Sequence, residues 1–272
     1  MPTNAAKTLY GKTVLITGAS SGIGRSCALE FARTSPSSLN LILTARRMDR
    51  LHSLATQIRE ELGQGIKIHV VQLDVSKPSQ VTQLWEGLPA DFQKVDILVN
   101  NAGFMSGYER APDIPPDVID AVWATNVTGL INMTQAFLKV AKGRDEGDGG
   151  RGDIVMLGSI AGREAYAGGS IYCASKAAVR SFTEALRKEL IATRIRVVTV
   201  DPGQVLTEFT VIRNRGDEAS ADKVYEGCDP LTPDDVAEVV VFACSRRENV
   251  VLAESVLLPT YQASALDIHR RF

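Results

Sequence analysis

The chain lacks the features that define several large classes of protein. Lys and Arg number 30 and Asp and Glu number 32, so the formal net charge of -2 leaves no basic excess for nucleic acid or an anionic membrane surface. No apolar run reaches the ~18 residues that a membrane-spanning helix needs. The first residues, Met-Pro-Thr-Asn-Ala-Ala-Lys, have no apolar core of the kind found in secretory signals. We therefore expect a cytoplasmic protein without nucleic-acid or membrane partners.

Cysteine is equally scarce. The chain has four widely spaced Cys residues, with no C-x-x-C pair and no His beside them: Cys27, Cys173, Cys228 and Cys244. This pattern predicts reduced thiols rather than a disulfide framework or a zinc site, and we expect no bound metal. The chain has 272 residues, 44% hydrophobic and 23% charged, which suits one or two domains with a large core.

Short apolar runs alternate with amphipathic ones along nearly the whole chain. We expect strands at residues 13–16, 39–45, 66–73, 95–99, 153–159, 195–200 and 250–258, and helices at 23–32, 50–62, 81–88, 115–140, 170–190 and 233–245. This alternation predicts an α/β protein with one doubly wound parallel sheet of about seven strands and helices on both faces. Ligands bind such sheets at the carboxyl ends of the strands.

The first expected strand leads into Thr-Gly-Ala-Ser-Ser-Gly-Ile-Gly (residues 17–24), and a helical pattern follows at once. Strand, glycine-rich turn and helix is the context in which a glycine motif binds a dinucleotide. Gly18, Gly22 and Gly24 allow a tight turn close to a pyrophosphate, and the helix N-terminus offers free N–H groups to the anion. The alternative is a plain glycine-rich turn.

The second expected strand ends at Arg46-Arg47. A site for NAD usually has an acidic residue near this position, which accepts from the ribose hydroxyls and would repel a 2′-phosphate. Guanidinium groups instead bind phosphate through paired, charge-assisted hydrogen bonds. The two arginines therefore favour NADP, although they are also compatible with a solvated pair at the start of a helix.

Polar and small residues follow the next two strands. Asp74, before Val75, is placed to accept from an adenine amino group or to cap the helix that begins near Pro78. Asn100-Asn101-Ala102-Gly103 is small enough to lie close to the adenosine side of a dinucleotide. Both segments extend the predicted cofactor site.

The fifth expected strand ends at Ser159, and the helix after it carries Tyr172 and Lys176 on one face. A lysine charge beside a tyrosine favours the phenolate, so we expect Lys176 to lower the pKa of Tyr172 toward neutral pH. Such a group can exchange a proton with an alcohol oxygen. Asn126 lies inside the long helix at 115–140, where it should kink the helix or hold a water.

Three segments have no predicted chemistry of their own. The glycine-rich stretch from Lys142 to Gly152 is interpreted as a surface connection. Residues 204–230 follow a strand end and are predicted to form a substrate lid, whose charges (Glu208 and Arg213 among them) slightly favour a small polar substrate. We expect the tail at 259–272 to pack against another subunit.

The motifs together resemble the short-chain dehydrogenase/reductase family over about residues 10 to 260. Residues 17–24, the Asn100–Gly103 segment, Y-x-x-x-K at Tyr172 and Lys176, and Pro202-Gly203 match its motifs in order. The resemblance implies a Rossmann fold, hydride transfer with NADP, and a catalytic tetrad of Asn126, Ser159, Tyr172 and Lys176. The cofactor residues that it and the reasoning above imply are Gly18, Ser20, Ser21, Gly22, Ile23, Gly24, Arg46, Arg47, Asp74, Val75, Asn101, Ala102, Gly103, Tyr172, Lys176, Pro202, Gly203, Val205 and Thr207.

The later part of the chain resembles the NADP-dependent 3-hydroxy acid (serine 3-dehydrogenase-like) branch of that family, through residues 230–237, 243–250 and 259–264. This resemblance implies a homotetramer that oxidises serine or a related small 3-hydroxy acid. In the implied mechanism Tyr172 is the general acid or base, Ser159 orients the substrate oxygen, and Asn126 holds a water behind Lys176. Two alternatives remain: a reductase for a steroid, retinoid or sugar ketone, and a non-catalytic NADP-binding redox sensor.

Overall fold

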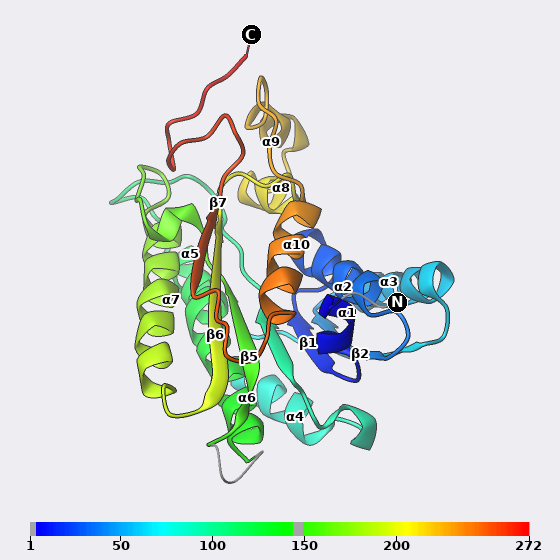
Figure 1. Ribbon diagram of the computed structural model, residues 1–272. Helices are drawn as coiled ribbons and strands as arrows, with labels where there is room; N and C mark the ends of the chain where they lie inside the picture. Colours follow the sequence, from blue (N-terminus) through cyan, green and yellow to red (C-terminus); the bar gives the residue numbers. More distant parts are fainter. Residues whose placement is uncertain (1–3, 144–148, 272) are drawn as a thin grey trace.

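The computed structural model describes residues 4–143 and 149–271, and a seven-stranded parallel sheet forms its centre (Figure 1). Its strands lie in the order β3-β2-β1-β4-β5-β6-β7. They are β1 (Thr13–Thr17), β2 (Leu39–Ala45), β3 (Ile66–Gln72), β4 (Ile97–Asn100), β5 (Arg151–Leu157), β6 (Arg194–Pro202) and β7 (Glu254–Leu257). The predicted doubly wound sheet is thereby confirmed.

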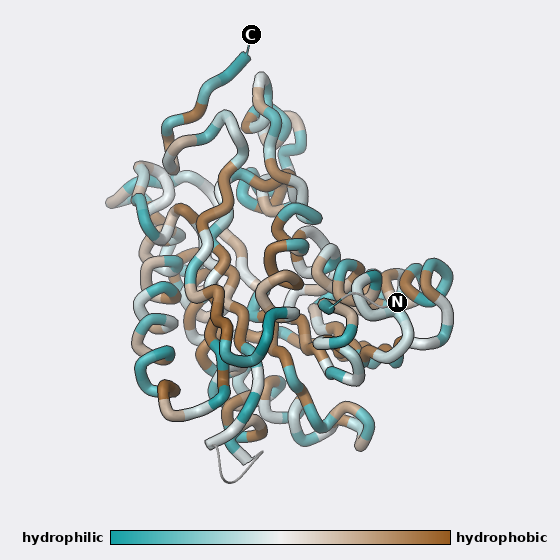
Figure 2. Tube along the Cα trace, in the orientation of Figure 1, coloured by the Kyte–Doolittle hydropathy of each residue, from teal (hydrophilic) through white to brown (hydrophobic). Residues whose placement is uncertain are grey.

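Helices cover both faces of the sheet. They are α1 (Asn4–Leu9), α2 (Gly22–Thr34), α3 (Met48–Leu62), α4 (Pro78–Glu86), α5 (Pro116–Val122), α6 (Leu130–Lys142), α7 (Ser170–Glu189), α8 (Glu208–Arg213), α9 (Glu218–Lys223) and α10 (Pro233–Cys244). α2, α3 and α10 share one buried core, and α4, α6 and α7 share the other. Figure 2 shows that hydrophobic residues gather along the strands and the inner helix faces. Of the described helices, none has the length and apolar character of a membrane span.

Both cores are filled from the same strands because successive side chains of a strand point to opposite faces. In β1, Val14 and Ile16 belong to the core of α2 and α10, whereas Leu15 belongs to that of α6 and α7. All three are fully buried. A strand that is buried on both faces gives an unbroken apolar run, which is why these strands were recognisable in the sequence.

The structure changes the bounds of several expected elements. β4 begins at Ile97 rather than at residue 95, β6 continues through Pro202, and β5 ends two residues before Ser159. β7 is limited to Glu254–Leu257, because the N–H of Val250 donates to Arg247 in a turn instead of to a neighbouring strand. In the glycine-rich stretch, residues 144–148 lie outside the described residues, and Arg151 already belongs to β5.

The long helix expected at 115–140 is continuous but irregular. A π-helical segment at Trp123–Gly129 separates α5 from α6, and Asn126 lies at its centre. π-turns in helices often occur at functional sites. The expected distortion at Asn126 is thus present, as a widened turn. The short helix α1 has no counterpart among the elements expected from the sequence.

The strand order fixes where a ligand fits. The chain runs outward from β1 to β3 and then returns to β4 on the other side of β1. The loops after β1 and β4 therefore diverge and leave a crevice at their carboxyl ends. The motif residues follow β1, β2, β3, β4, β5 and β6, so this sheet edge collects them.

Candidate active site

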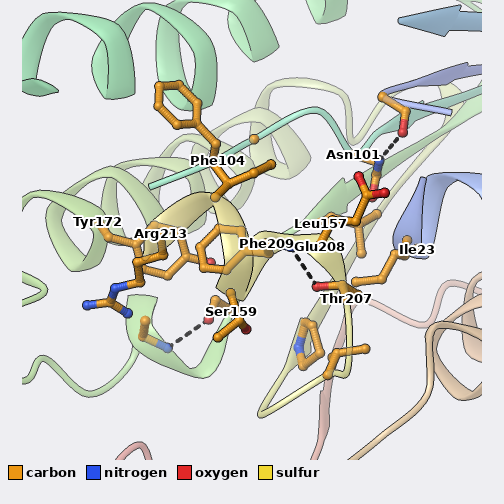
Figure 3. A pocket seen from close by; sticks show the side chains of 18 of the residues that line it. Ile23, Asn101, Phe104, Leu157, Ser159, Tyr172, Thr207, Glu208, Phe209 and Arg213 are labelled. Carbon is orange, nitrogen blue, oxygen red and sulfur yellow. Dashed lines mark hydrogen bonds between the residues drawn. The ribbon is translucent and has the colours of Figure 1, made fainter. Parts of the chain in front are cut away.

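A cavity of about 610 Å³ opens at the carboxyl ends of the strands (Figure 3). Every residue predicted to bind the cofactor lines it except Gly24, and so does Ser159. Asn126 does not line it. Gly24 lies behind the glycine-rich loop, where a Cβ would come within 2.5 Å of both the Gly18 carbonyl oxygen and the Asn101 amide nitrogen. Its place is structural: only glycine lets α2 start this close to β1.

The glycine-rich loop has the geometry of an anion cradle. Gly18 and Gly22 have φ values of +68° and +52°, which other residues rarely adopt. The Asn101 side-chain amide donates to the carbonyls of Thr17 (2.9 Å) and Gly18 (3.3 Å) and so ties the loop after β1 to that after β4. Ser21 makes no side-chain cap at the start of α2. The first N–H groups of the helix are therefore available to a pyrophosphate.

Arg47 lies at the end of this cradle. Its guanidinium donates to the hydroxyls of Ser20 (3.0 Å) and Ser21 (2.8 Å), and to a carboxylate oxygen of Glu208 on α8 (3.0 Å). Glu208 also pairs with Arg50. A cation fixed between two hydroxyls, and balanced only by a half-exposed carboxylate, fits an additional phosphate. The residues present therefore fit a 2′-phosphorylated dinucleotide.

The other two predicted cofactor contacts differ in how they are held. Arg46 lines the cavity but is exposed, so it is less fixed than its neighbour. Asp74 does not cap α4, whose N-cap is Lys77. Its carboxylate instead accepts from the N–H (3.0 Å) and hydroxyl (2.7 Å) of Ser76, which fixes the turn after β3.

Ser159, Tyr172 and Lys176 meet in the middle of the cavity. Ser159 follows β5, and the other two lie in the first two turns of α7. The Ser159 hydroxyl interacts with Tyr172 and lowers the pKa of its phenol. Lys176 Nζ donates to the Leu157 carbonyl at 2.7 Å and lies 5.8 Å from the centre of the Tyr172 ring. A phenol, a hydroxyl and an ammonium thus surround one point, as predicted.

The pKa values at this point differ from the expectation. Burial raises the pKa of Tyr172 well above its ordinary value, despite the Ser159 hydroxyl and the Arg213 charge, which lower it. Burial also lowers the pKa of Lys176 to about 8, against the opposing charge of Asp201. The lowered Tyr172 pKa expected from the sequence is therefore not found, because loss of solvent outweighs the neighbouring charges. Tyr172 is protonated at neutral pH.

Asn126 is buried next to these groups but does not line the cavity. Its amide accepts from the N–H of Phe104 (3.0 Å) and donates to the Phe104 carbonyl (2.9 Å) and the Ser175 hydroxyl (3.2 Å). A Cβ on Gly103 would lie 3.2 Å from Asn126 Oδ1 and 3.7 Å from Lys176 Nζ. Gly103 therefore occupies the narrow space between the two polar side chains.

The wall opposite the sheet contains residues that the sequence reasoning missed. The Phe209 ring packs on the Tyr172 ring with centroids 5.3 Å apart. Arg213, at the end of α8, donates to the Tyr166 hydroxyl (2.8 Å) and the Gly168 carbonyl (2.8 Å). Figure 3 shows Phe209 and Arg213 beside Tyr172. The sequence indicates Arg213 only as one of the charges of the lid, and no motif indicates Tyr166.

The C-terminal segment also reaches the cavity. Gln262 Oε1 accepts from the N–H of Gln204 (2.8 Å), and the N–H of Arg271 donates to the Gly227 carbonyl (2.8 Å). Gln262, Ala265, Leu266, Ile268 and Arg270 line the pocket. The tail therefore packs on residues 204–230 of its own chain, whether or not it also contacts another subunit.

Comparison with known proteins now gives the family. Residues 12–218 match the family model described as short chain dehydrogenase. The chain belongs to the short-chain dehydrogenase family. The resemblance predicted from its motifs is confirmed, and so is the expectation of an enzyme.

Several relatives cover almost the whole chain. An NADP-dependent 3-hydroxy acid dehydrogenase of Schizosaccharomyces pombe is 44% identical over 97% of this chain and 98% of its own. Sulfoacetaldehyde reductase 2 of Chromohalobacter salexigens is 40% identical over 94% and 98%. A structure described as the closed form of serine dehydrogenase complexed with NADP+ aligns with a TM-score of 0.82 and 36% identity, over 95% of this chain and 100% of that one.

Proposed function

We propose that the protein is an NADP-dependent dehydrogenase that interconverts a small 3-hydroxy acid, such as serine or a related polar compound, and the corresponding carbonyl compound. The observation that carries this proposal is the buried guanidinium of Arg213. It lies in the catalytic cavity, is 9% exposed, and acts electrostatically on Tyr172.

Neutral groups hold Arg213 in place, and it has no carboxylate partner in the part of the chain that the structure describes. Within residues 4–143 and 149–271 no carboxylate lies within ion-pair distance of its guanidinium, which stacks 4.1 Å from the Tyr108 ring centre. Its described hydrogen bonds involve three of its five N–H groups and neutral acceptors only. A buried charge is costly unless it is paired. A substrate anion would supply the missing charge beside the catalytic tyrosine.

The relatives' substrates share one chemical pattern. In a 3-hydroxy acid, one carbon atom separates the carbinol carbon from the carboxylate carbon. In sulfoacetaldehyde, one carbon atom likewise separates the aldehyde carbon from the sulfonate sulfur. Each therefore places an anion at a similar short distance from the reacting carbon. This spacing supports a site in which Tyr172 addresses the oxygen and Arg213 the anion.

The proposed chemistry assigns each step of proton handling to a residue. Bound NADP or NADPH supplies the hydride acceptor or donor. In reduction Tyr172, which is protonated at neutral pH, gives its proton to the substrate oxygen while Ser159 hydrogen-bonds that oxygen. Lys176 holds the ribose hydroxyls of the cofactor and favours return of a proton to Tyr172. Asn126 fixes Phe104 and Ser175 behind Lys176. Arg213 and Phe209 orient the substrate over the nicotinamide pocket.

The cofactor is proposed to lie along the residues that line the cavity. The loop from Gly18 to Ile23 and the start of α2 would hold the pyrophosphate, and Arg46 and Arg47 the 2′-phosphate. Asp74 and Val75 would face the adenine, with Asn101, Ala102 and Gly103 beside its ribose. Pro202, Gly203, Val205 and Thr207 would contact the nicotinamide side.

The test compares an acid with its neutral analogue. We expect reduction of NADP with 3-hydroxybutyrate or serine, and a loss of roughly 10-fold or more in kcat/KM for the methyl ester of the same hydroxy acid. Arg213→Gln should remove this preference by weakening turnover of the acid alone. Arg215→Gln, an exposed arginine two residues further on, serves as the matched control. Equal kcat/KM values for acid and ester in the unmodified enzyme would contradict the proposal.

Assembly and location are part of the same proposal. Residues 204–230 would act as a lid, since α8 and α9 flank the cavity. Phe242 on α10 and Val256 on the edge strand β7 are 52% and 45% exposed, and they give that side of the sheet apolar surface for a homotetramer. Light scattering after size-exclusion chromatography tests the tetramer; a monomer would contradict it. We propose a cytoplasmic location, which fluorescence microscopy of a tagged copy tests.

A further inference from the structure

A buried carboxylate outside all of the sequence motifs lies beneath the catalytic serine. Asp201, near the end of β6, has a side chain that is 2% exposed. Its Oδ1 accepts from the N–H of Ser159 at 3.1 Å. A Cβ on Gly158 would lie only 1.7 Å from the same oxygen. The carboxylate thus fills the space under the Gly158-Ser159 turn.

This contact restrains Ser159 at its main chain. The Ser159 hydroxyl accepts from the N–H of Ala161 (3.1 Å), and it lowers the pKa of Tyr172. The backbone is extended at Ser159 and enters a 3-10 helical turn at Ile160–Gly162 immediately afterwards. The hydrogen bond from the Ser159 N–H to Asp201 therefore fixes the main chain from which the hydroxyl projects. Misplacement of a reacting group by about 1 Å can cost roughly 100-fold in rate.

The negative charge of Asp201 also raises the pKa of Lys176. The Lys176 ammonium is buried and bonds to a neutral carbonyl, and Asp201 is the group whose charge opposes its loss of proton. The carboxylate is itself balanced by Arg163, whose Nε donates at 2.6 Å. Arg163 continues to Glu254 on β7 at 2.5 Å, and Glu254 faces Arg187 on α7 at 3.8 Å.

We propose that Asp201 is a positioning residue for the reaction: it fixes the main chain of Ser159, and its buried carboxylate lies beside the same Leu157–Ser159 segment to which Lys176 is hydrogen-bonded. Asp201 does not line the cavity and touches neither substrate nor cofactor. It acts through the two residues that do. The proposal rests on the roles proposed above for Ser159 and Lys176.

The chain offers a matched control at the other end of the same two strands. Asp153 on β5 and Arg196 on β6 form a buried ion pair with two contacts of 2.6 Å, and both side chains are at most 6% exposed. Asp153→Asn therefore removes a buried charge from the same sheet, far from the catalytic cavity. Any loss that comes only from destabilising β5 and β6 should appear in both variants.

The experiment measures kcat, KM and pH profiles for NADPH-dependent reduction of acetoacetate. The variant Asp201→Asn keeps an oxygen for the Ser159 N–H but removes the charge, and Arg163 keeps Glu254 as partner. We expect kcat to fall about 10-fold or more with KM within about 3-fold. The alkaline limb of the kcat profile should move to lower pH, because Lys176 loses its proton more easily. Asp153→Asn should lower the melting temperature without moving that limb.

Each outcome separates the inference from the proposed function. An unmoved alkaline limb in Asp201→Asn, or a kcat loss no larger than that of Asp153→Asn, would overturn the inference. If Asp201→Asn does not fold, Arg163→Gln loosens the same carboxylate, because the bond from Arg163 Nε to Asp201 is lost; kcat should then fall by more than in Asp153→Asn, with KM little changed. Wild-type turnover by Tyr172→Phe would instead overturn the proposed function, whatever Asp201 does.

Discussion

Because its ammonium is buried, we expect Lys176 to lower the stability of the folded protein. Its pKa falls from the 10.5 of an exposed lysine to about 8 because of burial. Each pKa unit corresponds to about 1.4 kcal/mol, so keeping the charge buried costs about 3 kcal/mol at pH 7. Lys176→Met has similar length and carries no charge. Losing the bond to the Leu157 carbonyl costs about 1 kcal/mol, which leaves a net gain of about 2 kcal/mol.

The pH dependence gives this prediction its sign. The folded pKa lies below the unfolded one, so the unfolded chain binds more protons between pH 8 and 10.5, and the wild-type protein gains stability as the pH rises through this window. We expect the melting temperature of Lys176→Met to exceed that of the wild type by roughly 4–8 °C at pH 7. The difference should shrink above pH 8, while turnover is lost at every pH.

Calorimetry at several pH values between 7 and 10 measures both effects. The matched control is Lys188→Met on the same helix, because the Lys188 side chain is 75% exposed and pairs with Glu184. It should change the melting temperature little at any pH. A Lys176→Met variant that melts at or below the wild-type temperature at pH 7, with a gap that does not vary with pH, would refute the reasoning.

Three further variants test other parts of the site and fold. Tyr172→Phe removes the transferable proton, so kcat should fall at least ~100-fold in steady-state assays; near-normal turnover would exclude Tyr172 as the acid. Arg47→Gln should weaken NADPH binding roughly 10- to 100-fold in fluorescence titrations and NADH binding at most about 2-fold. Arg46→Gln, at an exposed position, should weaken NADPH binding less. Equal losses for both cofactors would mean that Arg47 does not contact the phosphate. Asp153→Ala leaves Arg196 buried and unpaired, so we expect a loss of about 3–5 kcal/mol in urea unfolding; a loss below about 1 kcal/mol would contradict this pairing.

Much of the fold was predictable because the physical signals are local. A strand buried on both faces has a mainly apolar run, and Leu41, Ile42 and Leu43 in β2 show this directly. The glycine-rich turn is equally local, because positive φ values at Gly18 and Gly22 demand glycine. The weakest predictions were strand ends, such as β7, where exposure at the sheet edge removes the apolar signal.

The missed parts of the site depend on contacts between distant segments. Arg213 resembles any charged lid residue until the turn near Gly168 and the Tyr108 ring enclose it. Asp201 precedes Pro202-Gly203 in sequence, yet its partners Ser159 and Arg163 lie about 40 residues earlier. Burial also reversed the expected direction of the Tyr172 pKa, since the spacing of tyrosine and lysine carries no information about solvent.

Three of the cations that line the cavity differ in what balances them, and this difference suits the proposed ligands. Arg47 pairs with Glu208, both about 40% exposed, so a phosphate can replace this carboxylate at small cost. Lys176 is hydrogen-bonded to the neutral Leu157 carbonyl, and the charge of Asp201 offsets only part of the lowering of its pKa by burial. Arg213 has neither an exchangeable nor a permanent carboxylate among the residues described. In the proposed function only the anion of the substrate neutralises Arg213. The contact that binds the acid is therefore also the contact that selects it over a neutral compound.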